Sequence, residues 1–234
     1  MTGSKKVWSN FTARTGDLKL CILDTPEDRI DEAMELYIKY YVVEETICKS
    51  IGIKDNPEAL KEYEAIGSEG LFKNNSQVNI MTCCIVNEDG TLGDIVGVNF
   101  SYLSMADKPL ELNMDPQTKE VQTMLKVAVD MMSLYSIVNE HGVSKCYEGW
   151  GIIVHPSYRR LGIAQEFLKA RRLMCKDQGI SITGAWMTSI GTQKAAAREG
   201  YESVYELNFE EFGKKHGVNF KDTPEFCKFM IAKQ

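Results

Sequence analysis

The chain has 234 residues, 44% of them hydrophobic and 26% charged, and its 27 Lys and Arg against 33 Asp and Glu leave a formal net charge of −6. This composition is typical of a soluble globular protein with a sizeable core, and we expect a single domain over residues 1–234. The acidic balance without basic runs argues against a nucleic-acid surface, which needs clustered Lys and Arg. No apolar run is long enough to predict a membrane span or a signal peptide.

Five predicted elements make up the N-terminal half of the chain. In chain order they are a strand over 18–23, a helix over 26–48, a helix over 56–75, and two strands over 77–86 and 95–103. The helices are predicted from apolar residues at helical spacing and from a proline at each start. The last two strands are joined by Asn87-Glu88-Asp89-Gly90, a turn sequence that predicts an antiparallel hairpin.

The C-terminal half predicts alternating helices and strands. In chain order they are a loop over 105–114, a helix over 115–142, a strand over 146–154, a helix over 161–178, a strand over 180–187, a helix over 192–199, and strands over 201–209 and 224–232. Gly149 and Gly151 inside a strand predict a bulge or the close approach of another backbone or a ligand. The order favours a mixed α/β (α+β) fold, with one twisted mixed sheet and helices on both faces.

Two adjacent carboxylates interrupt the apolar stripe of the first predicted helix. The stripe includes Tyr37 and Tyr41, and the positions that should continue it three and four residues later are Glu44 and Glu45. An apolar face that ends in carboxylates indicates a site where chemistry takes place. Helical periodicity does not separate the two residues, since both flank the stripe.

The segment 151–164 (GIIVHPSYRRLGIA) runs from a strand into a loop with two arginines and then into a helix that begins near Gly162. Free N–H groups and the helix dipole make such a start an anion site, especially for a pyrophosphate. The segment is neither a Walker loop nor a dinucleotide fingerprint, because it lacks the Gly-Lys-Ser/Thr of the first and two glycines of the second. The alternative interpretation is an ordinary strand-to-helix junction with surface arginines.

Residues 159–164 (RRLGIA) match the Gln/Arg-x-x-Gly-x-Gly/Ala signature of the GNAT acyltransferase superfamily, and the strand, helix and Glu199-Gly200-Tyr201 around them fit that superfamily. More narrowly, residues 40–52 (YYVVEETICKSIG) resemble the first-helix segment of insect-type arylalkylamine N-acetyltransferases. The resemblance covers most of the chain and implies a GNAT-like fold. It also implies acetyl-CoA as the co-substrate and a small amine, an arylalkylamine above all, as the acceptor.

The same resemblance implies roles for individual residues. Glu45, the second acid of the pair, takes the place of the general base, and Thr188 and Thr192 take the places of two catalytic hydroxyls. The residues expected to bind the amine are Tyr40, Tyr41 and Glu44. Those expected to bind acetyl-CoA are Ile153, Val154, Arg159, Arg160, Leu161, Gly162, Ile163 and Ala164.

Amine acetylation makes physical demands that these residue types can meet. An alkylamine with a pKa near 10.4 has only about one molecule in a thousand unprotonated at pH 7, so that a base is needed. A carboxylate buried among tyrosines has a raised proton affinity and attracts the ammonium. The thioester oxygen needs a backbone N–H, which the resemblance places near Val154. The thiolate, with a pKa near 8.5, leaves without a strong acid.

Four positions depart from the family pattern. Thr46 stands where proline is usual, Thr188 and Thr192 stand where serines are usual, and Gly191 stands where many members have a tyrosine. These departures keep open a non-catalytic CoA-binding regulatory module as the rival from another class. Within the same chemistry, a polyamine or a peptide N-terminus is the alternative acceptor.

The seven cysteines are odd in number and irregularly spaced, which predicts neither a disulfide framework nor a thiolate metal site. The three histidines have no metal-binding spacing, and we expect no metal. Cys83 and Cys84 are expected in the core. A reduced, cytoplasmic location fits this cysteine usage. The expected partners are therefore a small amine and acetyl-CoA, without nucleic acid or membrane, and the sequence carries no signal for the oligomeric state.

Overall fold

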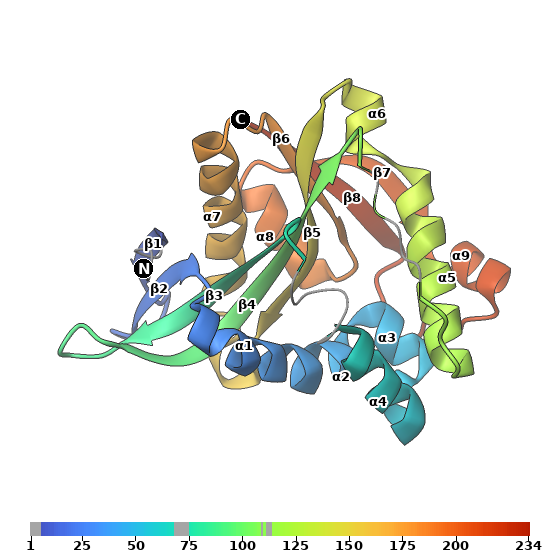
Figure 1. Cartoon of the computed structure of the whole chain (residues 1–234), viewed down its shortest axis with the longest axis horizontal. Coiled ribbons are helices and arrows are strands. Elements are labelled where there is room, and N and C mark those ends of the chain that lie inside the picture. The colour runs from blue at the N-terminus through green and yellow to red at the C-terminus, as the bar shows by residue number, and fades with distance from the viewer. Residues whose placement is uncertain (1–5, 68–74, 109, 111–113) are drawn as a thin grey trace.

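The computed structural model describes residues 6–67, 75–108, 110 and 114–234, and Figure 1 shows their arrangement. The strands are β1 Val7–Thr12, β2 Lys19–Asp24, β3 Val78–Val86, β4 Leu92–Met105, β5 Lys145–Val154, β6 Ile182–Met187, β7 Glu202–Asn208 and β8 Phe226–Lys233. The helices are α1 Ile30–Leu36, α2 Val42–Glu44, α3 Thr46–Ile51, α4 Pro57–Ala65, α5 Lys119–Leu134, α6 Ile137–His141, α7 Ile163–Asp177, α8 Ile190–Arg198 and α9 Phe209–His216.

The strands form one mixed sheet in the order β1-β2-β3-β4-β5-β6-β8-β7. Neighbouring strands are antiparallel except β5 and β6, which are parallel. The prediction of a mixed sheet is thus confirmed, and so is the hairpin of β3 and β4.

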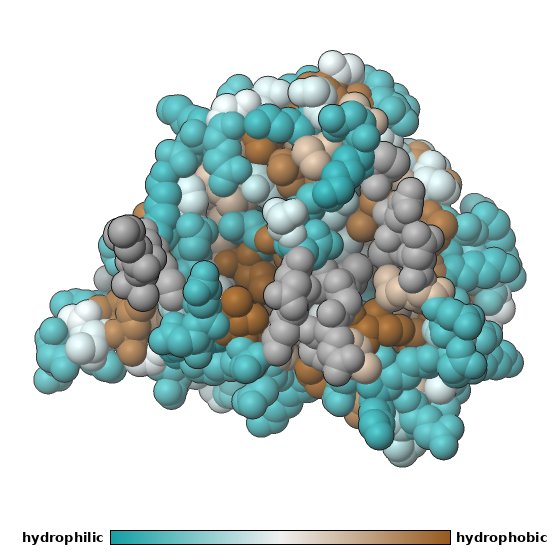
Figure 2. All heavy atoms as spheres, in the orientation of Figure 1, coloured by the Kyte–Doolittle hydropathy of each residue, from teal (hydrophilic) through white to brown (hydrophobic). Residues whose placement is uncertain are grey.

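Helices cover both faces of this sheet, as the alternation of buried side chains along the strands requires. On one face α7 packs on Ile22 and Val96, and α7 and α8 together cover Ala185 and Met230. Helices α1–α6 and α9 cover the other face, where Phe100 lies in the core. Hydrophilic side chains dominate the surface in Figure 2, with apolar ones gathered near its centre.

The predicted helix over 26–48 is wrong as a continuous element. It consists of α1, a π-helical segment Tyr37–Tyr41, and α2, and the chain becomes extended at Glu45 (ψ 138°) before α3 begins. The predicted helix over 115–142 is likewise divided into α5 and α6, because Tyr135 is extended and Ser136 caps the second piece. The predicted end of the helix over 56–75 lies outside the described residues, as does part of the loop over 105–114.

Two further elements have no counterpart in the predictions. Strand β1 is an edge strand with polar and half-buried residues, so that it lacks a strong apolar pattern. Helix α9 buries only Phe209, Phe212 and Gly213, and a stretch of eight residues is too short for a clear periodic signal. All seven cysteines are buried, which places Cys83 and Cys84 in the core as expected.

By length and composition alone, Lys119–His141 would suffice to cross a membrane. Core helices of soluble proteins also meet that criterion. Here the stretch is divided at Tyr135, and its residues Val127 and Met131 pack against Phe209 and Phe212 of α9.

Candidate functional site

The site lies where strands β5 and β6 separate. They pair only from Tyr147 to Gly149 on β5, opposite Thr183 to Ala185 on β6. At this point β5 has a bulge, because Gly149 and Gly151 face consecutive residues of β4 with Trp150 between them. The predicted bulge is confirmed. Beyond it the strands diverge around a cavity of about 800 Å³.

The bulge glycines also allow the close approach of two side chains, whereas the prediction named another backbone or a ligand. A Cβ atom on Gly149 would lie 2.1 Å from Nη1 of Arg171, a fully buried arginine of α7. A Cβ atom on Gly151 would lie 2.9 Å from the ring of Tyr41 on the other face. The shape of β5 at the fork therefore depends on glycine at both positions.

Past the bulge, β5 presents backbone groups to the cavity. The His155 N–H donates to the Val96 carbonyl at 2.9 Å. Backbone hydrogen bonds to the neighbouring strand are made by every second residue of an antiparallel pair. Ile153 therefore also forms backbone hydrogen bonds with β4. Ile152 and Val154 direct their N–H and C=O groups the other way, toward the gap left by β6. The Val154 carbonyl accepts from Nε of Arg159 at 3.1 Å, which leaves the Val154 N–H as a donor on this edge.

The N-terminus of α7 faces the same cavity. Gly162 is its N-cap with φ 97°, and the preceding Arg160 also has a positive φ of 65°. This turn directs the free N–H groups of the first helical turn outward. Several basic side chains line this cavity, among them Arg14, Arg159, Arg160, Lys194 and Arg198. A helix start beside several cations is an arrangement suited to bind an anion.

Glu45 occupies the break between α2 and α3. One carboxylate oxygen, Oε2, accepts from the backbone N–H groups of Ile47 at 2.8 Å and Cys48 at 3.0 Å, so that the side chain caps α3. The other oxygen, Oε1, accepts from the Thr188 hydroxyl at 2.9 Å. Glu45 lines the cavity, and no ion pair involves it among the residues of the described ranges.

Two opposing effects act on the proton affinity of Glu45. Burial raises the pKa of its carboxyl, and the hydrogen bonds from Cys48, Thr188 and Ile47 partly offset that rise because they favour the charged form. The result is a pKa above the ordinary value. When it is ionised, a carboxylate of this kind is a better proton acceptor than an exposed one.

Glu44, the other acid of the pair, has different surroundings. Its carboxylate is exposed at the rim of the cavity and forms an ion pair with Arg159 at 2.5 Å. Helical periodicity did not separate the two acids, but the structure does. Glu44 is paired with the cation of Arg159, whereas Glu45 is held by neutral donors inside the cavity.

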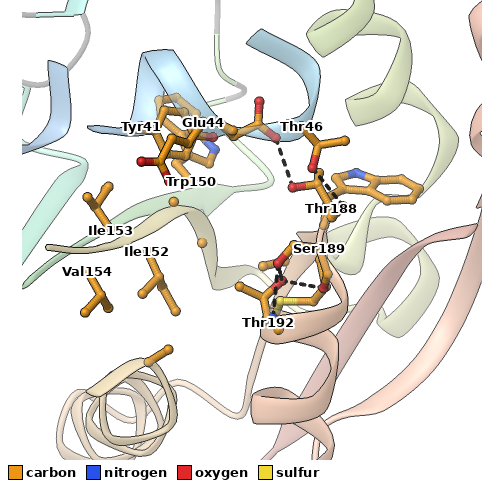
Figure 3. Close-up of a pocket in the computed structure, with 18 of the residues that line it drawn as sticks. Tyr41, Glu44, Thr46, Trp150, Ile152, Ile153, Val154, Thr188, Ser189 and Thr192 are labelled. Carbon is orange, nitrogen blue, oxygen red and sulfur yellow. Dashed lines mark hydrogen bonds between the residues drawn. The ribbon is translucent and has the colours of Figure 1, made fainter. Parts of the chain in front are cut away.

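Residues at the end of β6 complete this wall (Figure 3). Thr46, at the first position of α3, donates its hydroxyl to the Thr188 carbonyl at 3.1 Å. Proline is well tolerated at the first position of a helix, so the helix start at Thr46 is also compatible with proline, and Thr46 adds a hydrogen bond to the residue that follows β6. Thr188 is therefore fixed by both Glu45 and Thr46.

The second hydroxyl position, Thr192, lies in the first turn of α8. Its hydroxyl donates to the Ser189 carbonyl at 2.9 Å, and it lies 3.0 Å from the hydroxyl of Ser189, the cap of α8. Gly191 also lines the cavity, and a Cβ atom there would meet only Ser189 Oγ, at 3.7 Å. The missing side chain therefore leaves open space.

Aromatic rings line the opposite part of the cavity. Tyr41 stacks on Tyr37 with ring centroids 4.7 Å apart, and Trp150 stacks on Tyr102 at 4.8 Å. Tyr40 lies edge-on to His155 at 5.0 Å. Figure 3 places Tyr41 and Trp150 on the same side of the opening, with Thr188 across from them.

The structure brings nearly all predicted site residues to one cavity. Those that line it are Tyr40, Tyr41, Glu44, Glu45, Ile153, Val154, Arg159, Arg160, Gly162, Ile163, Ala164, Thr188 and Thr192. Leu161 is the exception, because its side chain packs into the core beside α7 and its carbonyl accepts from the Arg14 N–H. Arg14, Trp150, Ser189 and Glu148 also line the cavity. No sequence motif indicated these four residues.

Comparisons with known proteins support the fold. No model of a known protein family matches the sequence, and no curated sequence gives a significant match. Solved structures do match. A yellow fever mosquito protein assigned as arylalkylamine N-acetyltransferase 7 has a TM-score of 0.82 at 23% identity, over 99% of this chain and 96% of that one.

Two further structures are similar over most of the chain. Arylalkylamine N-acetyltransferase 2 of Aedes aegypti has a TM-score of 0.70 at 14% identity, over 92% of this chain and 98% of its own. The polyamine N-acetyltransferase of Drosophila melanogaster, described as forming N-acetylagmatine, has a TM-score of 0.66 at 12% identity, over 92% of this chain and 100% of its own. The chain therefore has the GNAT fold, and its structure resembles insect arylalkylamine N-acetyltransferases.

Proposed function

We propose that this protein transfers an acetyl group from acetyl-CoA to a small primary amine, with Glu45 as the general base. The observation that carries the proposal is the position of Glu45. Its carboxylate lines one cavity together with the free edge of β5 and the N-terminus of α7. A proton acceptor, an N–H donor and an anion site thus adjoin the same space.

The residues at the anion site fit coenzyme A. Acetyl-CoA supplies the acetyl group as an activated thioester. The first-turn N–H groups of α7 and the side chains of Arg159 and Arg160 would hold the pyrophosphate. The gap-facing backbone groups of Ile152 and Val154 would bind the amide-containing arm. Arg14, which lies over Gly162 and bonds to Gln165 of α7, adds a further cation.

The amine side of the cavity fits proton removal. Glu45 attracts the ammonium and accepts its proton, either directly or through one water. The Thr188 hydroxyl and two backbone N–H groups hold the carboxylate oriented while it does so. The Val154 N–H is the donor for the negative charge that develops on the carbonyl oxygen. Thr192 is the hydroxyl at the start of α8 that would assist the departing thiolate.

The aromatic lining favours an arylalkylamine as the acceptor. The rings of Tyr41 and Trp150 provide flat apolar surface beside Glu45. The structural relatives are described as acting on arylalkylamines in some cases and on a polyamine in another. A panel of arylalkylamines, polyamines and peptide N-termini, followed by release of the CoA thiol, tests the proposal and ranks these acceptors. Binding of acetyl-CoA without turnover of any amine would instead support the regulatory module.

The pH dependence of kcat/KM should report the environment of Glu45. Because burial raises the pKa of this carboxyl, activity should fall on the acid side at a pH above the ordinary Glu range near 4.3. In Thr188→Val the carboxylate loses one donor that favours its charged form, so its pKa should rise further and the acid limb should move to higher pH.

Both the amine substrate and Glu45 titrate, and their effects on kcat/KM are separated by comparing two amines whose pKa values differ by two units. A limb set by Glu45 stays at the same pH for both amines. A limb that follows the amine pKa, and that Thr188→Val leaves in place, would contradict the role of Glu45 in proton transfer.

A further inference from the structure

A second carboxylate lies in the same cavity and has no role in the chemistry above. Glu148 of β5 lines the cavity beside the bulge. Its recorded partners are the Ser104 hydroxyl and the Cys146 thiol, whose sulfur lies 3.8 Å from Oε1. Within the described ranges no Lys, Arg or His side chain forms an ion pair with it. Burial raises the pKa of this carboxyl.

A carboxylate in this setting loses solvation without gaining a cation in return. Weak neutral donors such as a hydroxyl and a thiol offset only part of that cost. Carboxylates that line a cavity without a protein cation are suited to bind a donor group of a ligand. A purely structural role would not require the side chain to border the cavity.

The strand register gives the backbone separation along the sheet between the level of Glu148 and the residue that binds Glu45. Glu148 is level with Gly184 of β6, whereas Glu45 is bound to Thr188, four residues further along the same strand. At about 3.3 Å per residue the two positions are about 13 Å apart along the sheet. After allowance for a hydrogen bond at each end, a ligand that reaches both has donor groups roughly 6 to 8 Å apart.

Part of the wall of the cavity that contains both acids is apolar. Helix α5 contributes Met124, Ala128 and Met131, and β5 contributes Trp150. A molecule with polar ends and an apolar middle section matches this arrangement. One end would meet Glu45, where acetylation takes place, and the other would meet Glu148.

We propose that Glu148 binds a second hydrogen-bond donor at the far end of the acceptor, so that the preferred substrates are amines with an ammonium or hydroxyl group at that end. This inference rests on the proposed acetyltransferase function and specifies its substrate class. Glu148 acts as a specificity residue, remote from the acetylated nitrogen.

Matched pairs of amines test the inference. Pentylamine is compared with pentane-1,5-diamine, and phenylethylamine with its 4-hydroxy derivative, and kcat/KM is measured for each. The wild-type protein should prefer the member with the distal donor by tenfold or more in at least one pair, beyond the twofold statistical advantage of a diamine. A hydrogen bond to a buried charged group accounts for about 10- to 100-fold. The pair with the larger ratio identifies the ammonium or the hydroxyl as the natural donor.

Substitutions then assign the preference to Glu148. In Glu148→Gln the ratio should fall tenfold or more, while in Glu202→Gln, which changes an exposed glutamate of β7, it should stay as in the wild type. In Glu148→Asp, whose side chain is one methylene shorter, the optimal diamine should lengthen by about one methylene. A merely structural role of Glu148 would not produce this shift in substrate length. If Glu148→Gln fails to fold, Glu148→Asp still tests the inference.

The outcomes separate the two proposals. Equal kcat/KM within both pairs in the wild type, or a ratio preserved in Glu148→Gln with no length shift in Glu148→Asp, overturns the role of Glu148 alone. Absence of turnover with every amine overturns the proposed function and this inference with it.

Discussion

Glu45→Gln is expected to lower kcat by about 10² to 10⁴, the usual cost of removing a general base. Glutamine is the informative substitution because its carbonyl oxygen can still accept from the Ile47 or Cys48 N–H and cap α3. Alanine would remove the cap as well, at a cost of about 1 kcal/mol of stability. The affinity for acetyl-CoA should change little, since Glu45 does not belong to the anion site at α7.

Glu44→Gln is the matched control, one residue away and identical in chemistry. Glu44 is exposed and paired with Arg159, so this variant should lose far less kcat than Glu45→Gln, and its effect should be seen mainly in the KM for acetyl-CoA. Steady-state kinetics with acetyl-CoA and the amine varied in turn measure both constants. Equal losses of kcat in the two variants would refute the assignment of the base.

Gly162→Val should raise the KM for acetyl-CoA strongly, by tenfold or more. The residue has φ 97°, which a β-branched side chain adopts only with strain, and its new Cβ would lie 3.1 Å from Nε of Arg14. The valine would project at the turn where the pyrophosphate is expected on the N–H groups of α7. Both effects weaken binding of the anion more than they affect proton transfer at Glu45.

Strain and blocked binding are separated by Gly217→Val. Gly217 ends α9, has φ 67° and has no atom within 4 Å of a Cβ position. Its substitution adds similar backbone strain at a site remote from the cavity. Thermal unfolding of both variants should show comparable losses of stability, whereas only Gly162→Val should change the KM for acetyl-CoA. An unchanged KM in a folded Gly162→Val protein would remove the support for the anion site.

The sheet and the strand, loop and helix start of residues 151–164 were predictable because their signals are local. The strands of the hairpin have continuous apolar runs, and residues 151–164 contain the whole strand, loop and helix start in one segment. Gly149 and Gly151 likewise predicted the bulge at the fork from two residues alone. In each case neighbours in the sequence are also neighbours in the site.

The rest depends on contacts between distant segments, which periodicity does not report. The helix breaks at Glu45 because the carboxylate caps α3 and accepts from Thr188, 143 residues later. The difference between Glu44 and Glu45 depends on Arg159 in the same way. Glu148 lies inside a strand, where alternation predicts a buried or an exposed side chain but does not report that the side chain borders a cavity.

The central claim is that one cavity places the acetyl donor at α7 and the amine at Glu45, and a structure with a bisubstrate analogue tests it most directly. In this analogue an acetyl group links the CoA sulfur to the amine nitrogen. The account predicts the pyrophosphate on the N–H groups at the start of α7 and the amine nitrogen within about 3.2 Å of the Glu45 carboxylate, or joined to it through one water. An analogue whose amine portion lies away from Glu45, or whose pyrophosphate lies away from α7, would contradict it.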